Sequence, residues 1–170
     1  MVHTSFGNLD KALSSFKDYN RQGKELIVSY PENVSFKNGL AISYEKLGET
    51  QSSLGNLEKA LEYFEERSRI GKELYTSYPE NVRFKNGLAI SYYKIAQLHE
   101  KKGDLEKAFS YYKLDLKFTE LTYKSSLQNA QFKKYLIISF NQMAKISDEL
   151  GKKAASKEYT KKAASLENLS

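Results

Sequence analysis

Histidines and carboxylates are the residues of this sequence whose types could support catalysis or metal binding. His3 and His99 lie far apart, and neither has a second His or a Cys at the spacing of metal ligands. His99 is more simply interpreted as a packed residue with local hydrogen bonds than as a general base. On an expected helix that also carries Lys and Arg, a group of acidic residues is typical of a solvated face, and this group comprises Glu62, Glu65 and Glu66.

No motif of nucleotide binding, metal binding or nucleophilic catalysis occurs in the chain. The sequence contains no GxxxxGK followed by Ser or Thr, no GxGxxG after a strand, and no HExxH, DxDxDG or GxSxG. It also contains no cysteine, which excludes disulfides, thiolate metal sites and a cysteine nucleophile. We therefore expect a protein that is not an enzyme and that uses no metal and no cofactor.

The ends and the charge of the chain give an expectation of location. The start, MVHTSFGNLDK, lacks the basic and apolar segments of a secretory signal. The longest apolar run, YLIISF, is far too short to span a bilayer. Absence of cysteine suits a reducing compartment, so we expect a soluble, cytoplasmic protein without a membrane partner. The net charge is +6, but both signs are mixed along most of the chain.

An internal repeat organises the chain. A shift of 48 residues aligns GNLDKALSSF at Gly7 with GNLEKALEYF at Gly55, GDLEKAFSYY at Gly103 and GKKAASKEYT at Gly151. More than half of the positions in the first two copies are identical, and both contain YPENV followed closely by FKNGLAISY. A constant period of this size predicts stacked supersecondary units with atypical copies at the ends.

Each repeat is expected to form two helices. The helix here called the A helix runs from about Asn81 to Lys102 in the second copy, with apolar residues three and four positions apart. A glycine closes it, because glycine accepts the left-handed conformation past a helix end, and the glycines at this place are Gly7, Gly55, Gly103 and Gly151. The other helix, the B helix, precedes it in the copy and stops at Pro79, which lacks the amide that a continuing helix needs. Each full helix is about 22 residues, or about 33 Å, long.

The stretch YEKLGETQSSLGNLEKALEYF resembles the tetratricopeptide repeat, whose pattern sets a large residue, Leu-Gly, a turn glycine, and Ala with an aromatic residue four positions later. The residues that match this pattern are Tyr44, Leu47, Gly48, Gly55, Ala60 and Phe64, then Tyr92, Ile95, Ala96, Gly103, Ala108 and Tyr112, and finally Phe140, Met143 and Ala144. The resemblance covers nearly the whole chain and implies an all-α, right-handed solenoid of helical hairpins.

The chain departs from this family in the length of its repeat. The familiar unit has 34 residues, and the extra residues lengthen the A and B helices equally, by about seven residues or two turns each. Glycines inside these helices cost about 1 kcal/mol each relative to alanine. We expect a close approach of a neighbouring helix, with its Tyr or Phe in the free space, at Gly23, Gly39, Gly71 and Gly87.

These patterns predict a single repeat domain over residues 1–170, with repeats 7–54, 55–102 and 103–150 and a capping helix in 151–170. Because the first repeat begins at its B helix, seven antiparallel helices are expected. The first one would leave part of an apolar face uncovered, formed by Leu9, Ala12, Leu13, Phe16 and Tyr19. Either the chain is a fragment of a longer array, which we favour, or a second copy covers this face in a homo-oligomer.

In proteins with tetratricopeptide repeats the A helices line a concave groove that holds a partner peptide. Carried over residue by residue, this resemblance places partner-binding side chains at Asn38, Glu45, Glu49, Asn86, Tyr93, Gln97, Lys134, Asn141 and Lys145. Glu45 and Glu49 occupy the places where some family members hold a C-terminal carboxylate with Lys and Asn, so that clamp is not expected here. The alternative interpretation is that all nine are ordinary solvated residues.

The function expected from these observations is a protein-interaction scaffold that binds a protein or peptide, in a bacterial-type protein. A nucleic-acid binder is the first alternative, since FKKY and KEYTKK are rich in lysine and helical repeats can read RNA. Residues Glu45, Tyr93 and Asn141 differ in kind from repeat to repeat, which disfavours it. A self-assembling structural repeat is the second alternative.

Overall fold

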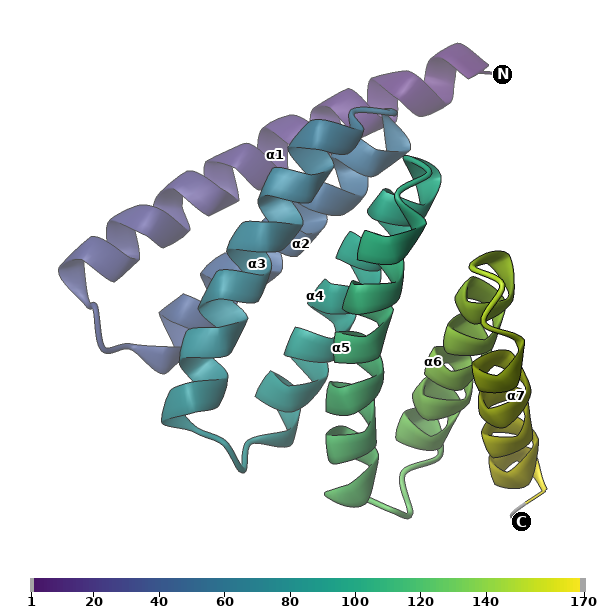
Figure 1. Cartoon of the computed structure of the whole chain (residues 1–170). Helices are drawn as coiled ribbons and strands as arrows, with labels where there is room; N and C mark the ends of the chain where they lie inside the picture. Colours follow the sequence, from purple (N-terminus) through teal and green to yellow (C-terminus); the bar gives the residue numbers. More distant parts are fainter. Residues whose placement is uncertain (1, 169–170) are drawn as a thin grey trace. The chain divides into compact units, whose positions relative to one another are not determined.

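The computed structural model describes residues 2–168, with side chains from residue 9 onward, so His3 lies outside the described side chains. Seven helices and no strand occur in this range (Figure 1). They are α1 (Val2–Ser29), α2 (Val34–Ser53), α3 (Leu57–Ser77), α4 (Val82–Lys101), α5 (Leu105–Lys124), α6 (Ala130–Glu149) and α7 (Lys153–Glu167). The prediction of an all-α fold of seven helices, arranged as helical hairpins, is confirmed.

Helix lengths differ somewhat from the expected 22 residues. Helices α2 to α6 have 20 or 21 residues, because capping and turn residues occupy the ends, and α7 has 15. Helix α1 has 28 residues and begins before Gly7, so the prediction that this glycine closes a helix is wrong, while the repeat bounds 7–54 stay a prediction. The other three glycines at this place behave as predicted: Gly55, Gly103 and Gly151 have φ values of 80°, 79° and 71°, which other residues rarely adopt.

The A helices α2, α4 and α6 each begin at an asparagine cap. The side chains of Asn33, Asn81 and Asn129 accept hydrogen bonds from the amides of Phe36, Phe84 and Phe132, respectively. In the first two copies this asparagine follows Pro and Glu, whereas the third keeps the asparagine without the proline. The cap therefore defines the start of the A helix even where the proline is lost.

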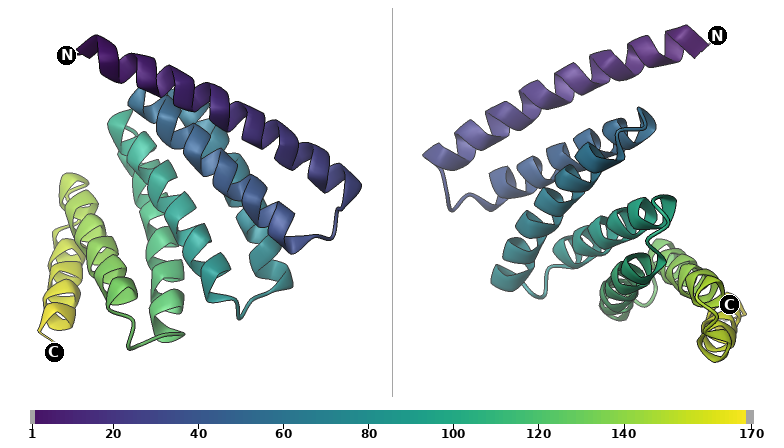
Figure 2. Two further views of the ribbon diagram at one scale, coloured as in Figure 1. Left: turned by 180° about the vertical axis from the view of Figure 1, so that it is seen from behind. Right: turned by 45° about the horizontal axis from the view of Figure 1, so that its top comes forward.

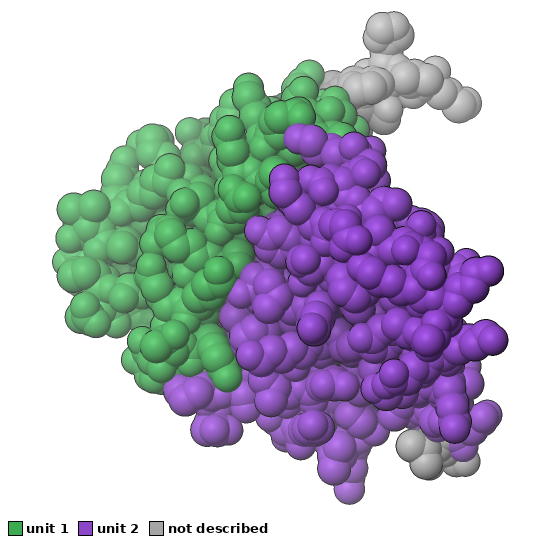
Figure 3. Space-filling view, in the orientation of Figure 1, with its two compact units in different colours: residues 1–78 green, residues 79–170 purple. Residues whose placement is uncertain are grey.

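The chain divides into two compact units, residues 1–78 and residues 79–170 (Figure 3). In the first, α2 packs against both α1 and α3; in the second, the contacting pairs are α4 with α5, α5 with α6, and α6 with α7. Figure 2 shows consecutive helices of each unit reversing direction at short turns. A single repeat domain over 1–170 stays a prediction.

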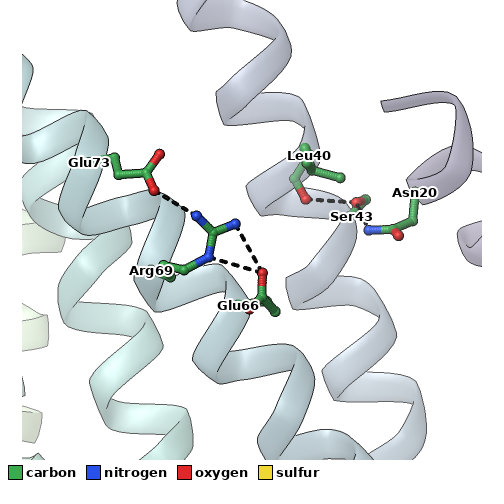
Figure 4. A network of polar contacts seen from close by, with 6 residues as sticks. All are labelled: Asn20, Leu40, Ser43, Glu66, Arg69 and Glu73. Carbon is green, nitrogen blue, oxygen red and sulfur yellow. Dashed lines mark hydrogen bonds and ion pairs between the residues drawn. The ribbon is translucent and has the colours of Figure 1, made fainter. Parts of the chain in front are cut away.

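In the first unit, a buried hydrogen bond joins α1 to α2. Asn20 Nδ2 donates to Ser43 Oγ at 2.8 Å, and Ser43 Oγ donates to the Leu40 carbonyl at 2.7 Å (Figure 4). The surface of α3 carries a different arrangement, in which Arg69 pairs with Glu66 and Glu73 within one helix. The first contact fixes two helices together, whereas exposed pairs on one helix stabilise it only slightly.

The apolar core of the second unit is a cluster between its four helices. The buried members are Ala96, Ala108, Tyr112, Leu116, Leu136, Phe140, Met143, Ile146 and Ala163. In α7, Ala163 is buried, and the other residues from Lys153 to Glu167 are exposed or half-buried. This is expected of a helix that caps a stack of repeats.

The helices run unbroken through their interior glycines, and the close approach expected there takes different forms. A Cβ on Gly23 would lie 3.3 Å from Leu40, so the neighbour is aliphatic and not aromatic. A Cβ on Gly39 would meet only the Tyr19 hydroxyl, at 3.4 Å. Gly71 and Gly87 are buried within α3 and α4.

The approach at Gly48, near the end of α2, is closer than those at Gly23 and Gly39. A Cβ there would lie 2.7 to 2.9 Å from three atoms of the Phe64 ring of α3, closer than real Cβ contacts. Phe64 is itself buried at 2% exposure. The ring of one helix therefore packs directly against the backbone of the other.

We expect Gly48→Ala to destabilise the protein by about 1–3 kcal/mol, because the overpacking of Phe64 outweighs the better helix propensity of alanine. Chemical denaturation followed by circular dichroism measures the change. The matched control is Gly39→Ala in the same helix, expected to be neutral or to stabilise by up to about 1 kcal/mol. Equal stabilisation by both substitutions would show that Phe64 moves aside freely.

Candidate functional site

The nine residues of the predicted binding face lie on the three A helices. In the first unit, α2 carries Asn38, Glu45 and Glu49, all half-buried. In the second unit, α4 carries the half-buried Asn86, Tyr93 and Gln97, and α6 carries the exposed Lys134, Asn141 and Lys145. Each unit therefore presents a polar A-helix face of its own.

In the first unit, the acidic residues of this face already have internal partners. Arg67 Nε of α3 donates to Glu45 Oε2 at 3.0 Å, and the two side chains are only 7% and 18% exposed. Glu49 pairs with Lys46 one turn away, at 2.9 Å and with both side chains much more exposed. Glu45 thus neutralises a buried cation, while Glu49 stays at the surface.

We expect Glu45→Ala to lower the free energy of unfolding by about 3 kcal/mol, because it leaves the buried Arg67 guanidinium without its counter-ion. Glu49→Ala, on the same helix, removes a surface pair and should cost less than about 1 kcal/mol. Urea denaturation of both variants tests this. Equal, small losses would mean that Arg67 finds water or another acceptor.

In the second unit, a polar network links α4, α5 and α6. Gln97 Nε2 donates to the Tyr93 hydroxyl at 3.1 Å, and the Tyr93 ring meets Tyr112 edge-on with centroids 5.9 Å apart. The Tyr112 hydroxyl donates to Glu100 Oε2 at 2.5 Å, and the Lys145 ammonium pairs with the other oxygen of the same carboxylate. Of the predicted binding residues, Lys145 therefore also joins α6 to α4, whereas Gln97 bonds within α4.

This network shifts the pKa values of its members. Burial raises the pKa of Tyr112, and its hydrogen bond to Glu100 raises it further. Burial also tends to raise the pKa of Glu100, but hydrogen bonds from Lys145 and Tyr112 outweigh it and hold the pKa below its usual value. At neutral pH the network consists of two neutral phenols, one carboxylate and one ammonium.

Beside this network, a recess of about 300 Å³ opens between α4, α5 and α6. Two of the predicted residues line it, Asn86 and Tyr93, whereas Lys134 and Asn141 do not. The full lining is Asn86, Ala89, Ile90, Tyr93, Lys94, Asp115, Thr119, Tyr135, Ile138 and Ser139. It combines aromatic and aliphatic walls with a few polar groups, as small binding sites do.

Asp115 is the one carboxylate in this lining, and it is 4% exposed. Ser139 Oγ donates to its Oδ2 at 2.7 Å, and Thr119 Oγ1 donates to its Oδ1 at 3.1 Å. Burial raises the pKa of Asp115 to about 7, although both hydrogen bonds act in the opposite direction. The carboxyl is therefore partly protonated at neutral pH.

We expect the buried Asp115 carboxyl to make the free energy of unfolding depend on pH. The unfolded chain loses the Asp115 proton near pH 4, whereas the folded chain keeps it to a pKa of about 7, so raising the pH between these values destabilises the fold. Relative to wild type, Asp115→Asn should therefore gain about 4 kcal/mol between pH 4 and pH 8. Denaturant titrations across this range measure the gain. Asp148→Asn, at an exposed position, is the control and should show no such trend.

Sequence reasoning missed Asp115, Thr119 and Ser139. Ala108, Tyr112, Asp115 and Thr119 follow one another at spacings of four, three and four, which puts them on one face of α5. A carboxylate within an otherwise buried helical stripe was the available signal. The partner on α6 could not be found this way, because serine recurs at that place in every repeat as Ser43, Ser91 and Ser139.

His99, the other side chain considered for catalysis, contacts neighbouring residues of the fold. His99 stacks on Tyr111 with centroids 5.5 Å apart, and its Nδ1 lies 3.7 Å from Asp104. Among the side chains described, those of residues 9–168, no three His, Cys, Asp or Glu gather as metal ligands would. No helix in the same range combines the length and the apolar character needed to cross a membrane.

A second recess, of about 600 Å³, lies between α5, α6 and α7 and contains none of the predicted residues. Its floor includes Leu136, Phe140 and Leu166. In the first unit, the row predicted to be uncovered on α1 is half-buried at Leu9, Ala12, Leu13 and Phe16, and Tyr19 is 52% exposed.

Comparison with known proteins gives one family match. A family model described as tetratricopeptide repeat matches residues 41–66 and 89–114. Both stretches span the end of an A helix, a turn glycine and the start of a B helix. No curated protein matches the chain.

Among solved structures, the crystal structure of BtubC (BKLC) from P. vanneervenii is similar to this chain, with a TM-score of 0.66 and 19% sequence identity. The match covers 93% of this chain and 56% of that chain, so this chain spans little more than half the length of BtubC. At this identity the likeness shows the fold alone.

Proposed function

Because the chain carries tetratricopeptide repeats, which generally mediate protein–protein interaction, we propose that it is a scaffold that binds a protein or peptide partner on its A-helix faces. In the second unit this face comprises Asn86, Tyr93, Gln97, Lys134, Asn141 and Lys145. In the first unit it comprises Asn38, Glu45 and Glu49.

The observation that carries this proposal is the recess between α4 and α6. It opens beside Asn86 and Tyr93, the two residues that the resemblance selects in the middle of the face. Tyrosine and amide side chains around a small hollow are what peptide-binding surfaces use, because the aromatic ring buries apolar area and its hydroxyl still bonds to polar groups. An aromatic or long side chain of a partner fits a hollow of this size.

The groups in the recess support a role in binding and give no support to a role in catalysis. The carboxyl group in the recess, Asp115, has hydroxyl partners and no neighbouring nucleophile–base pair of the kind that covalent catalysis needs. We therefore propose no catalytic role. A cytoplasmic location, a bacterial origin and pairing of two copies through α1 stay predictions.

A random peptide library displayed on phage and selected on the immobilised full chain tests the proposal. We expect selected peptides to bind the wild-type protein, and to bind at least about tenfold more weakly after Tyr93→Ala or Asn86→Ala, since a few contacts near the centre of an interface dominate its binding energy. Fluorescence anisotropy of labelled peptides measures the affinities.

The matched controls are Lys113→Ala on α5 and Glu62→Ala on α3, both at exposed positions of B helices. They should leave affinity unchanged. Selected peptides that lose affinity with these controls, and not with the A-helix variants, would move the binding site to the other face.

A pull-down from lysate, with and without nuclease, separates the nucleic-acid alternative. Partners recovered in both samples favour the scaffold. Partners lost on nuclease treatment favour nucleic-acid binding, which the positive charge of the chain would support.

A further inference from the structure

We propose that the recess above Asp115 in the second unit is a binding site for a basic side chain, the arginine or lysine of a partner segment, with Asp115 as its counter-ion. This inference rests on the proposed function, since it names the chemistry of the residue that the A-helix face would recognise. It is not implied by the family resemblance, because Asp115 lies on a B helix and matches no position of the repeat pattern.

The first argument is the state of the carboxyl. Asp115 is almost fully buried, and its only polar partners in the structure are the hydroxyls of Ser139 and Thr119. Each carboxylate oxygen accepts one hydrogen bond and can accept another. A buried carboxylate is costly unless a cation is paired with it, and the pKa of Asp115 is raised by burial, with hydroxyl hydrogen bonds as the opposing contributions. A cation that enters the recess would remove this cost.

The second argument comes from the repeat. The residue that aligns with Asp115 one repeat earlier is Arg67, and the residue that aligns with Tyr93 is Glu45. In the first unit these two form a nearly buried ion pair at 3.0 Å. The same place in the fold therefore accommodates a cation beside an anion. In the second unit the anion is present on the B helix, and a tyrosine replaces the internal partner.

The walls of the recess suit the long stem of a basic side chain. Ala89, Ile90 and Ile138 offer aliphatic surface, and Tyr93 and Tyr135 add aromatic rings, the type of group on which a guanidinium or ammonium packs favourably. A volume of about 300 Å³ holds one such side chain. An apolar side chain would instead seal Asp115 away from water and raise the cost of its charge.

Charged and titratable groups on α4, α5 and α6 face Asp115. They are Tyr93 and Lys94 of α4, Tyr112 of α5 and Tyr135 of α6. Burial raises the pKa of both Tyr93 and Tyr112 above its usual value near 10, so these phenols stay neutral. Lys94 lines the recess and yet is not among the causes of the Asp115 pKa shift. Asp115, with a pKa of about 7, changes charge between pH 6 and pH 8.

Small probes test the site without a partner protein. The full chain, labelled with ¹⁵N, is titrated with Nα-acetyl-arginine methylamide and Nα-acetyl-lysine methylamide, and with their neutral counterparts made from citrulline and norleucine. We expect at least one basic probe to bind saturably, with a dissociation constant on the order of 1 mM for a ligand of this size, and to shift the amide signals of the recess. The neutral counterparts should not.

Affinity should rise about tenfold from pH 6 to pH 8, as Asp115 becomes ionised. Asp115→Asn should abolish this binding at pH 8, whereas Asp148→Asn, at an exposed place on α6, should leave it unchanged. The pH dependence of the wild-type protein is a second readout that does not depend on how the Asp115 variant folds.

Three results would overturn the inference: no saturable shift with either basic probe, equal shifts with the neutral counterparts, or unchanged binding by Asp115→Asn. The outcome is independent of the peptide selection described above. Peptides that bind while both basic probes fail would remove the basic-residue site and leave the scaffold intact. Probe binding without any selected peptide would remove the scaffold and leave the site.

Discussion

The structure depends on how closely the two helices of a hairpin approach each other beside the glycine turn. In the first unit, the Phe64 ring lies against the backbone of Gly48, with no room for a Cβ between them. In the second unit the aligned residues are Ala96 and Tyr112, both fully or almost fully buried in one core cluster. A small residue on one helix and a large ring on the other give each hairpin its dense centre.

This dense centre leaves the remaining positions of each helix to polar residues, and the two units use them differently. In the first, Glu45 and Arg67 satisfy each other within the hairpin. In the second, the aligned Tyr93 and Asp115 form no such pair. Asp115 instead accepts hydrogen bonds from Thr119 on its own helix and from Ser139 on α6. One framework therefore supports a closed ion pair in one unit and an open, partly protonated carboxyl in the other.

Some residues of the polar A-helix face also make contacts within the protein. Gln97 and Lys145 bond to Tyr93 and Glu100, so they orient their neighbours as well as facing outward. Asn86 and Tyr93 differ from the rest because they line a hollow. A partner would find its anchoring points there, since a recess buries more of a side chain than a flat polar surface does.

The sequence by itself determined the helices, their hairpin pairing and their turns. These follow from local rules: glycines at a constant interval adopt positive φ, asparagines cap the A helices, and apolar stripes three and four residues apart need a neighbour. It misplaced the start of α1, because a glycine can also continue a helix and only its surroundings decide. The tertiary structure alone decided which polar residues are engaged. The helical spacing puts Glu45 and Tyr93 at equivalent positions on the face of an A helix. Whether a side chain of the next helix, Arg67 or Asp115, pairs with them depends on the distance between the packed helices, which the pattern of a single helix does not specify.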